Sequence, residues 1–234
     1  MSAASNEFLP SKASDLQVQL GLIPHPEGGC FLETFRSGST PMSSRGQSDL
    51  NVPERDLVHC PTRKDGCRPD SDVRRNCLTS IYWVPTKESP ILKLAYNVSD
   101  HVHYYQGGKP FEYTIYDPST KQVSKHVLGP DITNGQLLQF AVPGGLWKCG
   151  RLLVDELPSI QADYCIISEA VGPGFDVHDF HFANAKDLEE QHLDKEALQV
   201  LQPFLNVETA STETSSSEQP MVELKDKVFD KHYD

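Results

Sequence analysis

Positive charge is scarce in this sequence. It has 21 lysines and arginines against 33 aspartates and glutamates, which gives a net charge of −12 at pH 7. Binding to the phosphate backbone of a nucleic acid needs clustered lysines and arginines. The only basic clusters are two adjacent pairs that stand beside acidic residues, Arg63 with Lys64 and Arg74 with Arg75. We therefore expect no nucleic-acid partner.

Long apolar runs are also missing. No stretch approaches the roughly 20 apolar residues that a membrane-spanning helix needs. Residues 1–15 are polar and lack the apolar segment of a signal peptide. These absences predict that the protein has no membrane partner. A cytoplasmic location is the expectation, with the nucleus as the alternative.

The six cysteines lack the paired spacing of a zinc knuckle. Without a secretion signal, cysteines are most simply free thiols. The alternative is a zinc cluster made of His59, Cys60, Cys67 and Cys77, whose spacings do not match two CxxC pairs. We interpret that stretch as a loop that carries cysteines. We expect Cys149 and Cys165, which lie in apolar runs, to be core thiols.

The composition along the chain divides it into three parts. Residues 1–11 form a flexible N-terminus, residues 12–205 a single domain, and residues 206–234 a disordered, acidic tail rich in serine and threonine. Within the domain, residues 37–76 are polar and rich in proline, glycine and charge. That length is unusual for a simple loop in a compact domain, so we interpret it as a surface insertion.

Two stretches predict helices near the ends of the domain. In residues 12–22, Ser14 or Asp15 can cap the start, Gly21 can end the helix, and two leucines share one face. Residues 186–202 place leucines and an alanine on one side, which predicts one amphipathic helix.

Between residues 77 and 171, short runs rich in β-branched and aromatic residues alternate with turn signals. Examples are LTSIYWV, FEYTIYD and LLQFAV, and DPSTK at 117–121 predicts a hairpin turn. Many short strands at near-regular spacing predict an antiparallel sandwich or barrel, not alternating strands and helices. The predicted fold class is all-β with short N- and C-terminal helices.

Five motifs occur in order: PHPEGG at 24–29, TSIYW at 79–83, GGKPFEYTIY at 107–116, VPGGLWK at 142–148 and VGPGFDVHDF at 171–180. Together they resemble the cupin 5 branch of the cupin superfamily, a domain of unknown function with the PHPEGG signature. The resemblance runs from about residue 16 to residue 205. It implies an RmlC-like jelly roll, a double-stranded β-helix barrel. Proteins of similar fold include sugar-nucleotide epimerases and plant storage proteins, so the fold alone assigns no reaction.

The resemblance also implies a place for a metal, because many cupins bind one with histidines, a glutamate and a closing glycine. If Gly108 is the closing glycine, the glutamate position falls on His101 and two histidine positions fall on Ala95 and Asn97. The last histidine position falls on Lys148. An amide is a poor transition-metal ligand and an ammonium repels a cation. We therefore expect no metal and no cofactor.

The stretch HVHYY at 101–105 carries the candidate chemistry. Alternate side chains of a strand share a face, so His101, His103 and Tyr105 should enter the barrel and Tyr104 should point away. Histidine exchanges protons near neutral pH, and epimerases of similar fold pair a histidine base with a tyrosine acid. We therefore predict His101, His103 and Tyr105 as catalytic residues.

Four more polar residues are candidates for ligand binding: Asn97, Lys148, Arg36 and Glu27. Asn97 and Lys148 fall on pocket positions of the cupin pattern. Arg36 can bind an anionic substrate, and Glu27 lies in a glycine-rich turn at the rim. Glu33 and Arg36 are three apart on a predicted strand, so we expect them to face opposite ways.

Two other motifs are interpreted as structural. Trp147 is one residue away from Lys148 and should pack outward. FDVHDFH at 175–181 has a metal-like composition, but it follows GPG, so we interpret it as a surface turn that enters the last helix.

The favoured function is the binding of a small polar metabolite, for example a sugar derivative, in the barrel funnel, with no reaction assigned. One alternative is a metal-independent isomerase or epimerase that uses histidine and tyrosine as acid and base. The other is a metal-dependent cupin enzyme. Barrels of this kind pair along their edge strands, which also covers an exposed edge, so we expect a homodimer.

Overall fold

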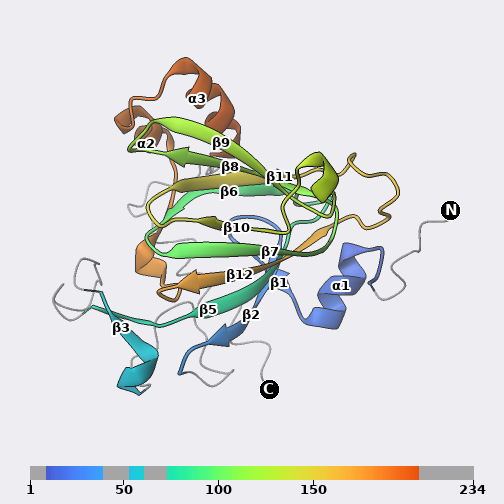
Figure 1. Ribbon diagram of the computed structural model, residues 1–234, viewed down its shortest axis with the longest axis horizontal. Coiled ribbons are helices and arrows are strands. Elements are labelled where there is room, and N and C mark those ends of the chain that lie inside the picture. The colour runs from blue at the N-terminus through green and yellow to red at the C-terminus, as the bar shows by residue number, and fades with distance from the viewer. Residues whose placement is uncertain (1–8, 39–52, 61–72, 206–234) are drawn as a thin grey trace, which may run out of the picture.

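Two antiparallel sheets form the centre of the molecule in the computed structural model, which describes residues 9–38, 53–60 and 73–205 (Figure 1). The larger sheet has the order β1 (Ile23–Pro24), β2 (Cys30–Arg36), β5 (Thr79–Val84), β12 (Cys165–Gly172), β7 (Asp100–Gly108) and β10 (Gln139–Val142). The smaller sheet has the order β13 (Phe180–Phe182), β6 (Ile91–Asn97), β11 (Trp147–Leu152), β8 (Phe111–Asp117) and β9 (Gln122–Leu128).

The main core lies between these two sheets. Trp83 from β5 packs edge-on against Phe111 from β8, with ring centroids 5.0 Å apart, and Phe111 packs in the same way on Tyr113 at 4.7 Å. These side chains are 1% exposed or less. Aromatic and β-branched residues at alternate positions fill this interior, as the strand pattern predicted. The predicted all-β jelly roll is confirmed.

The first helix, α1 (Ala13–Leu20), covers the edge of the barrel near β5 and β12. Gly21 ends it with a positive φ of 64°, and Leu16 is buried, both as predicted. The predicted cap is wrong. Lys12 is the residue before the helix and makes no side-chain cap, and the backbone N–H of Ala13 instead donates to Asp163, 2.7 Å away.

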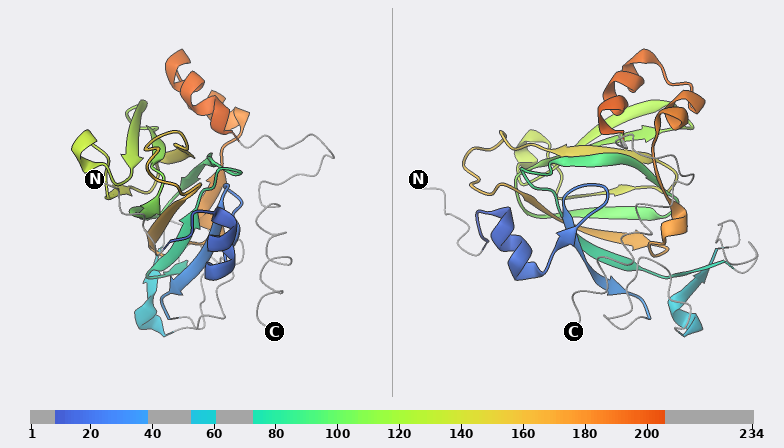
Figure 2. Two further views of the ribbon diagram at one scale, coloured as in Figure 1. Left: turned by 90° about the vertical axis from the view of Figure 1, so that its right-hand side faces the viewer. Right: turned by 180° about the vertical axis from the view of Figure 1, so that it is seen from behind.

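The predicted helix at 186–202 is two helices, α2 (Ala185–Glu190) and α3 (Lys195–Leu201). The side chain of Asp194 accepts a hydrogen bond from the N–H of Ala197 and so starts a new helix. His192, with a positive φ of 48°, turns the chain between them. These helices cover the outer face of the smaller sheet, at the opposite end of the molecule from α1 (Figure 2). Trp147 packs under them, outside the barrel, as predicted.

Part of the predicted surface insertion is built into the fold. A short 3-10 helix (Glu54–Asp56) leads into β3 (Leu57–His59), which pairs with β4 (Arg74–Asn76). Arg75 and Asn76 are fully buried. A buried arginine must pair with a carboxylate, and the partner of Arg75 is Asp179, which lies outside the insertion. The insertion is therefore docked on the barrel at its ends. Residues 39–52 and 61–72 lie outside the described residues.

Several other predictions concern the cysteines, the two ends of the chain, membrane-spanning helices and the pairing of two copies. Cys149 and Cys165 are buried thiols, as predicted, whereas the zinc interpretation involves Cys67, which lies outside the described residues. The predicted flexible N-terminus (1–11) and disordered tail (206–234) also fall largely or wholly outside them. No helix in the described ranges is long and apolar enough to span a membrane. The edge strands of the larger sheet are β1 and β10, and pairing of two copies stays a prediction.

Candidate functional site

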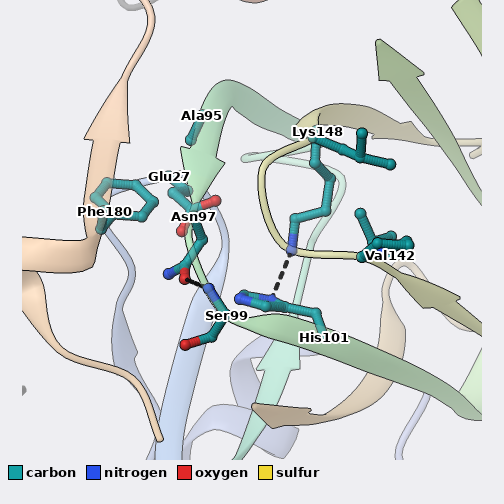
Figure 3. Close-up of a pocket in the computed structure, with 10 residues that line it drawn as sticks. Glu27, Ala95, Asn97, Ser99, His101, Val142, Lys148 and Phe180 are labelled. Carbon is teal, nitrogen blue, oxygen red and sulfur yellow. Dashed lines mark hydrogen bonds between the residues drawn. The ribbon is translucent and has the colours of Figure 1, made fainter. Parts of the chain in front are cut away.

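A small pocket that opens to solvent lies at one end of the barrel, between the two sheets. Figure 3 shows its polar residues converging from different elements. The turn before β2, the strands β6 and β7, the loop between them, β11 and β13 supply Glu27, Asn97, His101, Ser99, Lys148 and Phe180.

Lys148 reaches into the centre of this end of the barrel from β11. Its Nζ atom lies 3.3 Å from His101 Nδ1 and 3.4 Å from His103 Nε2. It also lies 3.7 Å from a carboxylate oxygen of Glu169, which comes from β12. All four side chains are at least nine-tenths buried, except that the His101 side chain is 11% exposed. One ammonium therefore contacts three groups from two other strands.

Glu169 is the partner that gives this cluster its charge balance. The register of β12 on β7 places Glu169 directly opposite His103, and its Oε1 atom lies 3.2 Å from His103 Nδ1. Burial alone would raise the pKa of Glu169, but Lys148 and the two histidines hold that pKa well below 4.5. Glu169 is therefore a buried carboxylate paired with a buried ammonium, and the pair carries no net charge.

The hydrogen bonds assign the proton positions on the two histidines. A lysine ammonium only donates, so His101 Nδ1 and His103 Nε2 are acceptors. A neutral imidazole carries its proton on the other nitrogen. For His103 that is Nδ1, which faces Glu169 and lies 3.3 Å from the hydroxyl of Tyr113. His101 Nδ1 lies 3.3 Å from the Lys148 ammonium and 3.5 Å from Glu169 Oε2, and we assign it as the acceptor of the nearer ammonium, which leaves the proton on Nε2.

Burial keeps both imidazoles neutral. It lowers the pKa of His103 from 6.5 to about 4, with Glu169 opposing this shift and Lys148 adding to it. The pKa of His101 is lowered for the same reasons, burial first and Lys148 second. At neutral pH the cluster therefore consists of one cation, one anion and two neutral rings.

Two buried polar atoms at the pocket have no hydrogen-bond partner in the part of the chain that the structure describes. They are His101 Nε2 and the amide nitrogen of Asn97, Nδ2. The oxygen of the same Asn97 amide accepts from the backbone N–H of Ser99 at 2.8 Å, which fixes the amide so that Nδ2 is its donor end. Unsatisfied buried donors are costly, so both are placed to donate to a bound acceptor.

A tight turn places Glu27 at the pocket. Gly28 has a φ of +114°, and a Cβ there would lie 2.0 Å from the backbone oxygen of Ile91, so the position requires glycine. The N–H of Glu27 donates to His25 Nδ1 at 3.2 Å, and its backbone oxygen accepts from Lys93 at 2.9 Å. Burial raises the pKa of the Glu27 carboxyl to about 7. The PHPEGG turn therefore presents a carboxyl group that exchanges its proton near neutral pH.

The wall of the pocket that carries Phe180 is held by the segment predicted as a surface turn, and that interpretation is wrong. Asp179 is 3% exposed and accepts from Arg75 at 2.9 and 3.0 Å. Its backbone oxygen accepts from Val98 N–H at 3.0 Å, and Phe180 follows it in β13 beside Asn97. A buried ion pair therefore anchors the strand that carries Phe180 to the pocket.

The structure brings together most of the residues singled out in the sequence. His101 and His103 are buried on one face of β7, whereas Val102 and Tyr104 between and after them are half-buried, as alternation predicted. Lys148 contacts both histidines. Glu27 and Asn97 line the same pocket.

Tyr105 and Arg36 lie elsewhere. The Tyr105 ring packs on the main core, its hydroxyl donates to the backbone oxygen of Gly108, and it does not line the pocket. The predicted orientation of Arg36 is wrong, because Arg36 and Glu33 pair at 2.9 and 2.8 Å. A bulge between Glu33 and Phe35 adds a residue to the strand and reverses the alternation. Arg36 also donates to the backbone oxygen of Phe175 at 3.0 Å, so it anchors a loop.

Sequence reasoning missed Glu169 and Phe180. Glu169 stands at an inward position of β12, between the buried Ile167 and Val171. A lone carboxylate at such a position is the signal that points to it, because a buried charge must be paired. Phe180 had no such signal, since β13 is three residues long and its pairing with β6 is a long-range contact.

The described residues do not fit a resident metal ion. Nitrogen atoms of His101 and His103 and an oxygen of Glu169 lie within 4.8 Å of one another, which resembles a ligand set. However, the Lys148 ammonium lies 3.3 to 3.7 Å from all three groups and supplies the positive charge they require. A metal bound beside it would face a buried cation at close range.

Comparison with known proteins places this chain in a family. A sequence model described as cupin superfamily (DUF985) matches residues 14–183. The uncharacterized protein YML079W of Saccharomyces cerevisiae is 35% identical over 189 residues, which cover 79% of this chain and 83% of the yeast protein.

Two solved structures are similar over most of the chain. A hypothetical protein from Leishmania major is 27% identical with a TM-score of 0.64, and the match covers 83% of this chain and 98% of that one. Protein SO0799 from Shewanella oneidensis has 20% identity and a TM-score of 0.60, with 84% and 98% covered. The second likeness shows the fold alone.

Proposed function

We propose that this chain, a member of the DUF985 family of the cupin superfamily, binds a small, neutral, polar metabolite in the pocket beside His101. The observation that carries the proposal is the pair of unsatisfied buried donors, His101 Nε2 and Asn97 Nδ2, at the pocket. Both side chains are held in place, one by Lys148 and the other by Ser99. Fixed donors of this kind bind an acceptor oxygen at little cost in side-chain entropy.

The charge of the pocket favours a neutral ligand. Lys148 and Glu169 cancel each other, and both histidines are neutral. Glu27, whose pKa is about 7, adds negative charge as the pH rises. A phosphate or carboxylate would meet no unpaired cation among the residues that line the pocket, so a carbonyl or hydroxyl oxygen is the better fit.

The apolar part of the lining supports a ligand with carbon faces as well as oxygens. Phe180, Val142 and Leu146 face the same space. A sugar derivative such as a lactone or free sugar combines hydroxyl and carbonyl oxygens with apolar C–H faces that pack on such side chains.

A ligand screen by thermal shift and nuclear magnetic resonance tests this function. Neutral sugars and sugar lactones should stabilise the protein, whereas the corresponding sugar phosphates should bind more weakly. Asn97→Asp keeps the acceptor for Ser99, removes the NH₂ donor and turns a carboxylate oxygen toward the ligand's acceptor oxygen, so it should weaken binding by about tenfold or more. Val18→Ala, at an 84% exposed position of α1, is the control and should bind as the wild type does. Preference for the phosphates would contradict the proposal.

A second candidate function is proton transfer to or from the bound metabolite, as in an isomerase. The favouring observation is the Glu27 carboxyl at the pocket, whose pKa of about 7 suits a general acid–base group. The predicted tyrosine acid, Tyr105, does not line this pocket, so Glu27 replaces it in the proposal.

Exchange of hydrogen for deuterium at a carbon of the bound sugar, followed by nuclear magnetic resonance in heavy water, tests this second function. Glu27→Gln should abolish the exchange while the sugar still binds. Binding without any exchange in the wild type would leave the protein a binder and not an isomerase.

A further inference from the structure

We infer that the Lys148 ammonium takes the place of a divalent metal ion, and that His101, His103 and Glu169 form a metal site that this lysine keeps closed. This inference concerns the cluster behind the pocket and does not depend on which metabolite binds in front of it. It also goes beyond the sequence pattern, in which the metal positions fall largely on other residues.

The first support is the chemistry and burial of the three groups. Two imidazole nitrogens and a carboxylate oxygen are the donor types that bind cobalt, nickel, iron and zinc. Their ligand atoms lie within 4.8 Å of one another, and His103 is fully buried while Glu169 is 6% exposed. A metal–ligand bond of about 2.1 Å allows ligand atoms about 4.2 Å apart at most, so closure requires shifts of roughly half an ångström.

The second support is the position of the ammonium. Lys148 Nζ is within 3.7 Å of all three groups, and its contacts with the two histidine nitrogens are 3.3 and 3.4 Å. These distances are typical of hydrogen bonds and ion pairs and exceed metal–ligand bonds by more than 1 Å. The lysine therefore holds the three groups slightly farther apart than a metal would.

The third support is the charge. Glu169 is a buried anion that requires a cation, and Lys148 is the cation within ion-pair distance of it. Removing the lysine charge leaves a carboxylate and two neutral imidazoles facing one another. His101 and Lys148 both line the pocket, so an ion from solvent can reach the cluster.

The experiment replaces Lys148 in the full chain and uses Co²⁺ as the probe. Lys148→Met removes the charge at similar length, Lys148→His adds a third imidazole, and Lys148→Arg keeps the charge as the control. Co²⁺ binding is followed by visible absorption, equilibrium dialysis and the shift in melting temperature. The double variant Lys148→Met/Glu169→Gln lacks one of the three ligands. Any Co²⁺ that it still binds therefore measures binding by surface histidines.

Lys148→Met and Lys148→His should each bind one equivalent of Co²⁺ and melt at a higher temperature in its presence. Their affinity should exceed that of the wild type and of Lys148→Arg by about tenfold or more, because these variants carry no buried cation beside the three ligands. The gain should disappear with Glu169→Gln. If a variant is unfolded alone, Co²⁺ should restore its fold.

Three results would overturn the inference. The first is a Glu169-dependent equivalent of Co²⁺ on the wild type that is as tight as on Lys148→Met. The second is a folded Lys148→Met and Lys148→His that gain no Glu169-dependent site. The third is unfolding of both variants without rescue by Co²⁺.

Discussion

The buried imidazole of His103 makes the stability of this protein depend on pH in a window that its pKa defines. Burial lowers this pKa from 6.5 to about 4, so below pH 6.5 the unfolded chain takes up a proton that the folded protein does not. The contribution is present in full above pH 6.5 and is lost as the pH falls through about 4. One pKa unit corresponds to about 1.4 kcal/mol, so His103 accounts for about 3 kcal/mol of the free energy of unfolding.

The variant His103→Gln isolates this effect, because glutamine can still bond to its neighbours but takes up no proton. Urea unfolding followed by tryptophan fluorescence gives the free energy of unfolding at each pH. Between about pH 6.5 and pH 4, the free energy of unfolding of the wild type should fall more steeply with decreasing pH than that of His103→Gln. The difference in slope should reach up to about 1.4 kcal/mol per pH unit, the value for one proton. Glu27, whose pKa is raised, opposes this slope in both proteins and cancels in the difference.

The control is Leu16→Ala, which removes a 2% exposed side chain under α1, far from any titrating group of the pocket. It should lower the free energy of unfolding by about 2–5 kcal/mol at every pH and leave the slope unchanged. The reasoning would be refuted if His103→Gln kept the wild-type slope, because the imidazole would then be protonated equally in the folded and unfolded states.

Three further predictions test the supports of the pocket. Arg75→Leu should lower the free energy of unfolding by about 3–5 kcal/mol in urea, because it removes the guanidinium from a buried pair with Asp179, and an unchanged midpoint would contradict this. Gly28→Ala should prevent folding or lower the melting temperature strongly. Gly135→Ala, with open space around its Cβ and a φ of +84°, should lower the free energy of unfolding by only about 1 kcal/mol. Equal losses of stability in the two variants would be inconsistent with the steric argument. Tyr113→Phe should cost about 0.5–1.5 kcal/mol in urea through the lost hydroxyl contact, and no change would show that the hydroxyl adds nothing.

The charge pattern of the cluster explains how this barrel holds a polar end without unfolding. Each buried charge has an opposite partner, and each buried ring nitrogen except His101 Nε2 has a neighbour. The single exception faces the pocket, where a ligand can satisfy it. The proposed ligand would therefore satisfy the ring nitrogen that the described residues leave without a partner.

The sequence alone determined the features that depend on local geometry. The period of two along β7 is a property of the extended backbone, so it placed His101 and His103 on one buried face before any partner strand was known. The glycines of PHPEGG are needed for backbone angles that other residues avoid, so they marked the turn that presents Glu27. The density of short strands and turns was enough for the fold class.

Only the tertiary structure decided which distant residues meet. Glu169 faces His103 because β12 pairs with β7 in one register, and a shift by one residue would turn the carboxylate outward. The bulge in β2 reversed Arg36, and the long-range pair of Arg75 with Asp179 tied the end of a polar insertion to the segment that carries Phe180. Lys148 was expected in the pocket, but its place among three buried groups depends on the packing of two sheets. Register, bulges and sheet packing are set by contacts across the whole chain, and local sequence patterns do not encode them.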